Sequence, residues 1–188
     1  MKKQSNQKQV PETKVITGKV QIAFPNVYTP RAASEGQEPR FSVCLLIPKN
    51  DKDTLAKINA GITAAKQQGS GQWNGGSLDI KLPLRDGDVE KPESPAFRGV
   101  YFMNASSKAR PGVVDRALNE IVDPSQIYSG CFCRVSLNFY PYNQNGNAGV
   151  GCGLNHLQKL ADGSLPSERA SAEEDFSIVG EDEEDLLG

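Results

Sequence analysis

Two stretches of alternating apolar and polar residues flank the dipeptide Asn145-Gly146 in this chain of 188 residues. Asn-Gly between two alternating segments is a strong signal of a two-residue β-hairpin loop. We therefore predict a strand over residues 131–142, a turn over 143–147 and a returning strand over 148–157. If Asn145 and Gly146 form the loop, residues whose numbers add up to 291 face each other.

This register divides the hairpin into two faces of different chemistry. One face is apolar and is expected to belong to the core; its pairs are Phe139 with Cys152, Leu137 with Leu154, and Val135 with His156. The other face has large polar side chains on its first strand only; its pairs are Tyr142 with Gly149, Tyr140 with Gly151, Asn138 with Gly153, Ser136 with Asn155, and Arg134 with Leu157. Glycines beside the tyrosines leave a shallow trough where a nucleobase can stack. Alternatively, each tyrosine folds over its cross-strand glycine and shields the backbone.

The rest of the chain predicts a mainly β fold with one helix. Alternation predicts a strand over 14–24, bent or bulged at Gly18, whose apolar face holds Ile16, Val20, Ile22 and Phe24. More strands are expected over 40–47, within 78–85, over 100–105 and at 113–114. Helical spacing of apolar residues predicts a helix from Asn50 or Asp51 to a C-cap at Gly69. This pattern favours a small barrel or closed sheet with one added helix.

The charges of the chain are unevenly distributed. Of its 23 acidic residues, eight lie in residues 173–188, which hold no Lys or Arg. Residues 1–172 therefore hold 15 acids and all 21 basic residues, a net charge of +6. A basic body attracts polyanions, and an acidic tail can compete with them, although a charged tail can also simply aid solubility. We expect a disordered arm over 1–12, one domain over 13–160, and a linker with a disordered acidic tail over 161–188.

Several classes of protein are disfavoured. No apolar run is long enough to span a membrane, and the polar N-terminus is no secretory signal, so a cytoplasmic location and reduced thiols are expected. Cys131 and Cys133 fit small buried hydrophobes better than a zinc site, and the single histidine, His156, has no partner cluster. We expect no catalytic residues, metal or cofactor. Four acids around Gly87 could be read as a magnesium site, but an exposed turn is the favoured interpretation; they are Asp79, Asp86, Asp88 and Glu90.

Single-stranded nucleic acid is the ligand that these features favour, because grooves for single strands combine aromatic stacking with cationic side chains. The predicted binding residues are Tyr140, Tyr142, Arg134 and Asn138 on the hairpin, Lys108 and Arg110 in a basic loop, and Tyr101, Trp73, Lys19 and Arg85 elsewhere. Trp73 lies in a Gly-rich loop and serves either as a stacking platform or as a plug at the core edge. The alternative function is a protein-interaction module that does not bind DNA.

The chain also resembles the phage single-stranded DNA-binding proteins of the kind described from a tailed enterobacterial phage. The resemblance covers roughly 15–160 and the tail. The matching stretches are KLPLRDGD at 81–88, YFMNASSK at 101–108, PGVVD at 111–115, YSGC at 128–131, RVSLNFY at 134–140 and GCGLN at 151–155.

That resemblance implies a non-enzymatic protein with an OB-fold core that coats single-stranded DNA during phage replication and recombination in the bacterial host cytoplasm. It also implies that the acidic tail contacts replication partners and screens the DNA surface. The tail residues concerned are Glu181, Asp182, Glu183, Glu184, Asp185, Leu186 and Leu187. This tail ends in Leu-Leu-Gly, whereas the tails of better-known single-strand binders end in an aromatic residue.

Overall fold

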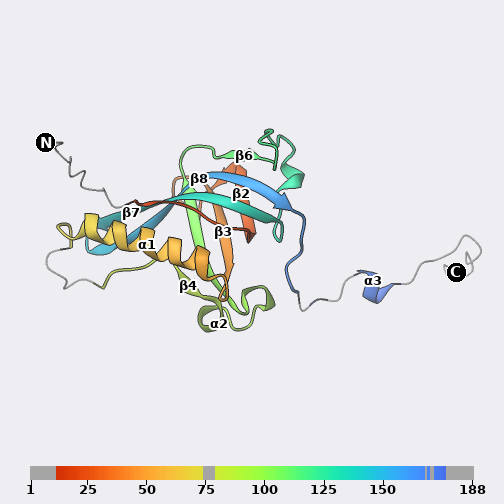
Figure 1. Ribbon diagram of the computed structural model, residues 1–188, viewed down its shortest axis with the longest axis horizontal. Coiled ribbons are helices and arrows are strands. Elements are labelled where there is room, and N and C mark those ends of the chain that lie inside the picture. Colours follow the sequence, from red (N-terminus) through yellow and green to blue (C-terminus); the bar gives the residue numbers. More distant parts are fainter. Residues whose placement is uncertain (1–11, 74–78, 168, 170–171, 177–188) are drawn as a thin grey trace, which may run out of the picture.

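The computed structural model describes residues 12–73, 79–167, 169 and 172–176 (Figure 1). Its strands are β1 (Lys14–Ile16), β2 (Val20–Arg31), β3 (Arg40–Pro48), β4 (Arg85–Asp86), β5 (Val100–Ser107), β6 (Gly112–Val114), β7 (Phe132–Gln144) and β8 (Asn147–Ala161). Its helices are α1 (Lys52–Gly69), α2 (Gly87–Glu90) and α3 (Ala172–Asp175), with 3-10 turns at Pro95–Phe97 and Pro124–Gln126. No helix within these ranges is long and apolar enough to cross a membrane.

Five strands close into a barrel in the order β7-β2-β3-β5-β8, and β8 pairs again with β7. The pairing of β5 with β8 is parallel, and the other pairings within the barrel are antiparallel. Outside the ring, β1 pairs with the middle of β7, and β6 pairs with β8. The predicted small barrel with one added helix is therefore confirmed.

The barrel interior is filled by alternate residues of its strands, as in β3, where Val43, Leu45 and Ile47 point into the main core. Helix α1 covers the barrel beside β7, and Gly61 lets it approach closely, since a Cβ there would lie 2.7 Å from the Phe139 ring. The Asp51 side chain caps the helix by accepting a hydrogen bond from the Thr54 amide (3.1 Å).

The predicted C-cap of this helix is wrong by one residue. The helix ends at Gly69, and its C-cap is Ser70 in a right-handed conformation. Gly69 is needed for packing instead, because a Cβ there would lie 2.5 Å from Pro141 and 2.7 Å from the Trp73 ring.

The predicted hairpin register is confirmed from the loop to the Leu137–Leu154 pair. Asn145 and Gly146 both have positive φ, as a type I′ loop requires. Beyond that pair, an irregularity at Asn155 shifts the pairing by one residue. The predicted pairs Val135–His156, Ser136–Asn155 and Arg134–Leu157 are therefore wrong; the structure pairs Val135 with Leu157, Ser136 with His156, and Arg134 with Gln158. The shift buries Leu157 and leaves the polar His156 exposed, which avoids desolvation of an imidazole.

The predicted strand over 14–24 is two strands, β1 and β2, separated at residues 17–19. Thr17 is buried there, and its hydroxyl accepts a hydrogen bond from the Val135 amide (3.0 Å) and donates one to the Gly18 carbonyl (2.8 Å). The break changes which side chains face inward, so that Val15 is buried and Ile16 is exposed. The core assignment of Ile16 is therefore wrong. That of Phe24 is wrong for another reason: Val20 and Ile22 are buried as predicted, but Phe24 lies in a bulge of β2 with a φ of 49° and is exposed.

The predicted strand within 78–85 is also shorter than expected. The structure has only β4 and a single bridge from Lys81 to Gly149, and residue 78 lies outside the described residues.

A second apolar cluster covers part of the outer surface of β3 and β5; it consists of Ala23, Cys44, Leu46, Phe97 and Phe102. Leu165, from the segment after β8, packs against this cluster. The same segment is held by hydrogen bonds from Tyr128 Oη to Asp162 (2.5 Å) and from Gln21 Nε2 to the Ser164 carbonyl (3.1 Å). The chain therefore remains attached to the barrel as far as Leu165.

Candidate nucleic-acid interface

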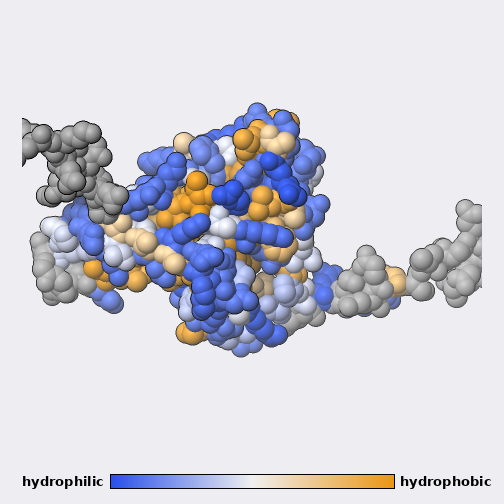
Figure 2. All heavy atoms as spheres, viewed as in Figure 1, coloured by the Kyte–Doolittle hydropathy of each residue, from blue (hydrophilic) through white to orange (hydrophobic). Residues whose placement is uncertain are grey.

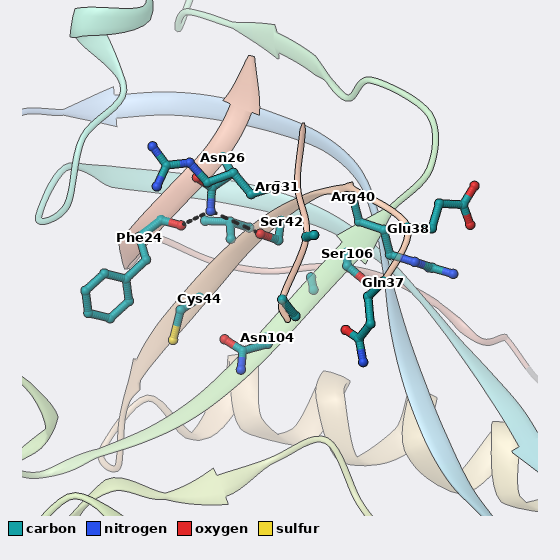
Figure 3. Close-up of a pocket in the computed structure, with 14 residues that line it drawn as sticks. Phe24, Asn26, Arg31, Gln37, Glu38, Arg40, Ser42, Cys44, Asn104 and Ser106 are labelled. Carbon is teal, nitrogen blue, oxygen red and sulfur yellow. Dashed lines mark hydrogen bonds between the residues drawn. The ribbon is translucent and has the colours of Figure 1, made fainter. Parts of the chain in front are cut away.

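A pocket of about 620 Å³ lies on the outer surface of β2, β3 and β5, beside the loop between β2 and β3 (Figure 3). Its lining mixes apolar residues with polar and charged ones; the polar and charged residues are Asn26, Arg31, Gln37, Glu38, Arg40, Ser42, Asn104 and Ser106. Cys44 also lines it, and burial raises the pKa of that thiol to about 11, so the thiol stays protonated at neutral pH. We call this the β2–β5 pocket; its size suits a nucleobase or a similar planar group.

Phe24 stands at the rim of the β2–β5 pocket with 64% of its surface exposed (Figure 3). The face of the molecule seen in Figure 2 is mainly hydrophilic, with hydrophobic atoms in groups between the hydrophilic ones. It lies in a bulge of β2 and has a φ of 49°, which is uncommon for a bulky residue. Its amide donates to Ser129 Oγ (2.9 Å), and its carbonyl accepts from Asn26 Nδ2 (3.2 Å). These bonds hold the backbone so that the aromatic ring faces solvent beside the pocket.

The sequence reasoning missed this residue, although a signal was present. Pro25 follows Phe24 and cannot donate a ladder hydrogen bond, so a bulge at this point of the strand was foreseeable.

A row of small or polar residues crosses four neighbouring strands from the β2–β5 pocket. Ser42 of β3 pairs with Ser106 of β5, Ser106 with Gly153 of β8, and Gly153 with Asn138 of β7. Their neighbours along each strand, such as Val43, point inward, so the row lies on the outer surface. At about 4.8 Å per strand, the row spans on the order of 14 Å. We call it the cross-strand row; it is a path without large side chains.

Of the two hairpin tyrosines, Tyr140 borders the end of this row, where its ring lies 3.8 Å from a Cβ built at Gly153. A Cβ at Gly151 would lie 2.4 Å from Cζ of Tyr140, and one at Gly149 would lie 2.8 Å from the Tyr142 hydroxyl. Each ring therefore lies over its cross-strand glycine, and the second of the two interpretations above is confirmed. The predicted open trough is absent from this hairpin. Tyr140 keeps 39% of its surface exposed, so its ring is a flat platform instead.

A second pocket, of about 540 Å³, lies where β5 ends beside β8. Ser106 lines the first pocket and Ser107 the second, so the two are adjacent across the end of β5. The lining of this second pocket, the β5–β8 pocket, comprises Lys14, Ser107, Ala109, Arg110, Asn138, Leu154, Asn155 and His156.

The structure brings together several predicted binding residues. Asn138 and Arg110 line the β5–β8 pocket, and Tyr140 borders the cross-strand row. Lys108 is exposed and forms an ion pair with Glu38 (2.8 Å), whose pKa is lowered by that hydrogen bond. Because this ion pair is exposed, a phosphate can compete for Lys108 at little cost.

Other predicted residues lie elsewhere. Trp73 is only 4% exposed, and its Nε1 donates to the Tyr142 carbonyl (3.3 Å), so it is a plug and not a stacking platform. Arg85 pairs with Glu90 over the Phe102 ring, and Lys49 covers Tyr101. Lys19 lies over the Phe132 ring, and Arg134 donates a hydrogen bond to the Thr17 carbonyl. Tyr142 is half-buried, with its ring over Gly149. Tail residues 181–187 lie outside the described residues.

The acidic turn around Gly87 binds side-chain cations. Lys49 Nζ lies 2.7 Å from both Asp86 and Asp88, and these contacts lower the pKa of Asp88 and raise that of Lys49. Arg85 likewise lowers the pKa of Glu90. The part of the chain that the structure describes contains no cluster of His, Cys, Asp and Glu that could hold a metal. Cys131 and Cys133 are buried thiols with their sulfurs 3.9 Å apart.

Comparison with known proteins identifies the family. A family model described as "Enterobacter phage Enc34, ssDNA-binding protein" matches residues 13–187. The chain belongs to the Enc34 single-stranded DNA-binding protein family. A relative of this Enc34-family chain, protein p50 of Acyrthosiphon pisum secondary endosymbiont phage 1, is 31% identical over 189 residues, covering 93% of this chain and 98% of the relative.

Solved structures share the fold of this Enc34-family chain. The Enc34 single-stranded DNA-binding protein in complex with ssDNA has a TM-score of 0.68 and 23% identity, covering 82% of this chain and 90% of that one. The single-stranded DNA-binding protein gp2.5 of bacteriophage T7 has a TM-score of 0.61 and 14% identity, covering 85% and 96%. These likenesses confirm the OB-type barrel. The family and both of these structures are named for binding single-stranded DNA.

Proposed function

We propose that this chain binds single-stranded DNA with little sequence preference along the β2–β5 pocket and the cross-strand row. Phe24 carries the proposal: an exposed aromatic ring, fixed beside the β2–β5 pocket by backbone hydrogen bonds, can stack on any base. Arg31 and Arg40 line the same pocket and supply charge for phosphates. In OB-folds generally, the outer face of the second and third barrel strands binds oligonucleotides, and here β3 and β5 occupy those positions.

The family supports this proposal, because its name specifies single-stranded DNA and the Enc34 protein has been solved in complex with ssDNA. A role in phage DNA replication and recombination, in the bacterial host cytoplasm, is the context in which a protein that coats single strands acts. We further propose that the acidic residues 173–188 compete with DNA and recruit replication or recombination proteins. The net charge of +6 on residues 1–172 supports the competition.

Fluorescence anisotropy of a labelled oligo-dT strand, titrated with the full chain, tests the proposal. We expect saturable binding that weakens as salt rises, with similar affinities for strands of mixed sequence. Unlabelled duplex DNA and RNA serve as competitors that define the preferred polymer. A chain that leaves the anisotropy unchanged at low salt would be a protein-interaction module instead.

A further inference from the structure

The β5–β8 pocket gathers cationic and hydrogen-bonding groups from distant parts of the sequence. Lys14 comes from β1, Arg110 from the loop before β6, and His156 from β8, and all three side chains are exposed. None of the residues that line this pocket is acidic. Within the described part of the chain, Lys14 and Arg110 form no ion pair that would neutralise them; Arg110 instead lies over the Tyr28 ring, 5.5 Å from its centre. A concave site lined by cations without a counter-charge attracts anions.

The histidine has a defined hydrogen-bonding role. Nδ1 of His156 accepts a hydrogen bond from the Gly112 amide (3.1 Å), so in the neutral ring the proton is on Nε2. Gly112 permits this contact, since a Cβ there would lie 2.9 Å from Nδ1. His156 therefore offers Nε2–H as a neutral donor. It reaches this position because of the irregularity at Asn155, which turns it from the expected core face to the exterior.

The site also lies on the proposed path of the DNA. Asn138 belongs to both the cross-strand row and the β5–β8 pocket, and Lys14 pairs with Asn138 across β1 and β7. A strand that leaves the β2–β5 pocket along the row therefore arrives at these cations.

We infer that the β5–β8 pocket is a phosphate subsite, in which Lys14, Arg110 and His156 bind an internal phosphodiester of the DNA strand. This inference rests on the proposed function. The contacts of Lys14 and Arg110 with the phosphate release counterions from the DNA. His156 instead donates a hydrogen bond from Nε2, and this contact releases no counterion.

The experiment measures the affinity of the full chain for hydroxyl-ended oligo-dT by anisotropy at several salt concentrations. The variants are Lys14→Gln, Arg110→Gln and His156→Ala. Lys57→Gln is the matched control, because Lys57 is exposed on α1 and lines neither pocket. Circular dichroism and thermal melting of each variant verify that it folds.

For Lys14→Gln and Arg110→Gln, we expect the slope of log K against log salt to become shallower by about 0.7 each, with about fivefold weaker binding at 0.1 M salt. His156→Ala should weaken binding about two- to tenfold with an unchanged slope. Lys57→Gln should change neither quantity. A 5′-phosphate on the oligonucleotide should not alter these differences.

The inference is overturned if folded Lys14→Gln and Arg110→Gln variants bind the oligonucleotide with the wild-type affinity and slope. It is also overturned if the effects require the 5′-phosphate, because the site would then bind strand ends. A wild-type chain that does not bind oligo-dT would instead refute the proposed function, and the two failures are thus distinguishable.

Discussion

At the scale of single residues, Phe24 combines two features that are both unfavourable for the folded chain. A bulky side chain at positive φ costs energy, and exposing the ring forgoes the gain from its burial. Both features are explained if the ring is used by a ligand. We expect Phe24→Ala to weaken single-stranded DNA binding by about 1–3 kcal/mol. Because the ring is exposed, the melting temperature should change little. Anisotropy titrations and thermal melts measure the two effects.

Leu118 provides a matched control for this substitution. It is also an apolar residue at positive φ, it is 72% exposed, and it lines neither pocket. Leu118→Ala should leave DNA affinity unchanged. Equal losses for the two variants would mean that the Phe24 ring has no specific role.

The hairpin tyrosines differ in exposure, and we expect them to differ in function. Tyr140 borders Gly153 of the cross-strand row, whereas Tyr142 is half-buried and its carbonyl receives the Trp73 hydrogen bond. Tyr140→Ala should weaken binding by about 1–3 kcal/mol, and Tyr142→Ala should have a smaller effect. The same titrations compare them. A larger loss of affinity for Tyr142→Ala than for Tyr140→Ala would mean that the base stacks on Tyr142, nearer the hairpin loop.

The Thr17 hydroxyl makes two hydrogen bonds at the break between β1 and β2. The Thr17 side chain accepts the Val135 amide in a buried position, so Thr17→Val leaves that amide without its side-chain acceptor. We expect a loss of about 1–3 kcal/mol in the free energy of unfolding, measured by urea denaturation. Thr63→Val, an identical change at an exposed position of α1, should have a much smaller effect. A neutral Thr17→Val would show that the break is set by Gly18 alone.

The elements that were predictable are those whose signal is local. Asn145-Gly146 determines a type I′ loop, and from it the strand register follows directly as far as Leu137–Leu154. The irregularity at Asn155 was not predictable, because it depends on whether Leu157 or His156 fits the core, and that choice depends on packing between distant strands. The same limit applies to the face of β1, which the buried Thr17 reverses.

The candidate site was predictable only in part for the same reason. Polar and aromatic residues on the hairpin were visible as an alternation within one segment. The β2–β5 pocket, in contrast, combines Asn26, Ser42 and Ser106 from three strands, and no single stretch of sequence shows that they meet. Trp73 was misassigned as a binding residue because a Gly-rich loop gives no indication of whether its ring is buried.

At the scale of the whole molecule, the charges are divided between residues 1–172, with a net charge of +6, and residues 173–188, with eight acids and no Lys or Arg. Removing residues 173–188 deletes eight acids, and we expect tighter DNA binding at low salt, with a smaller effect at high salt where charges are screened. Anisotropy titrations of the truncated chain at two salt concentrations measure this effect.

A tail of unchanged length in which the acids are replaced by their amides separates charge from bulk. The full chain with this uncharged tail should bind DNA as tightly as the truncated chain. If the truncated chain binds DNA more weakly than the full chain, the tail does not compete with DNA, and it instead stabilises the complex.

The position of Trp73 has a practical consequence for spectroscopy. It is the only tryptophan in the chain, and it is sealed between the end of α1 and the hairpin tip. Its emission should be blue-shifted and resistant to acrylamide quenching in the native protein. The indole thus reports whether the helix and the hairpin are docked, and it lends itself to following refolding in a stopped-flow instrument.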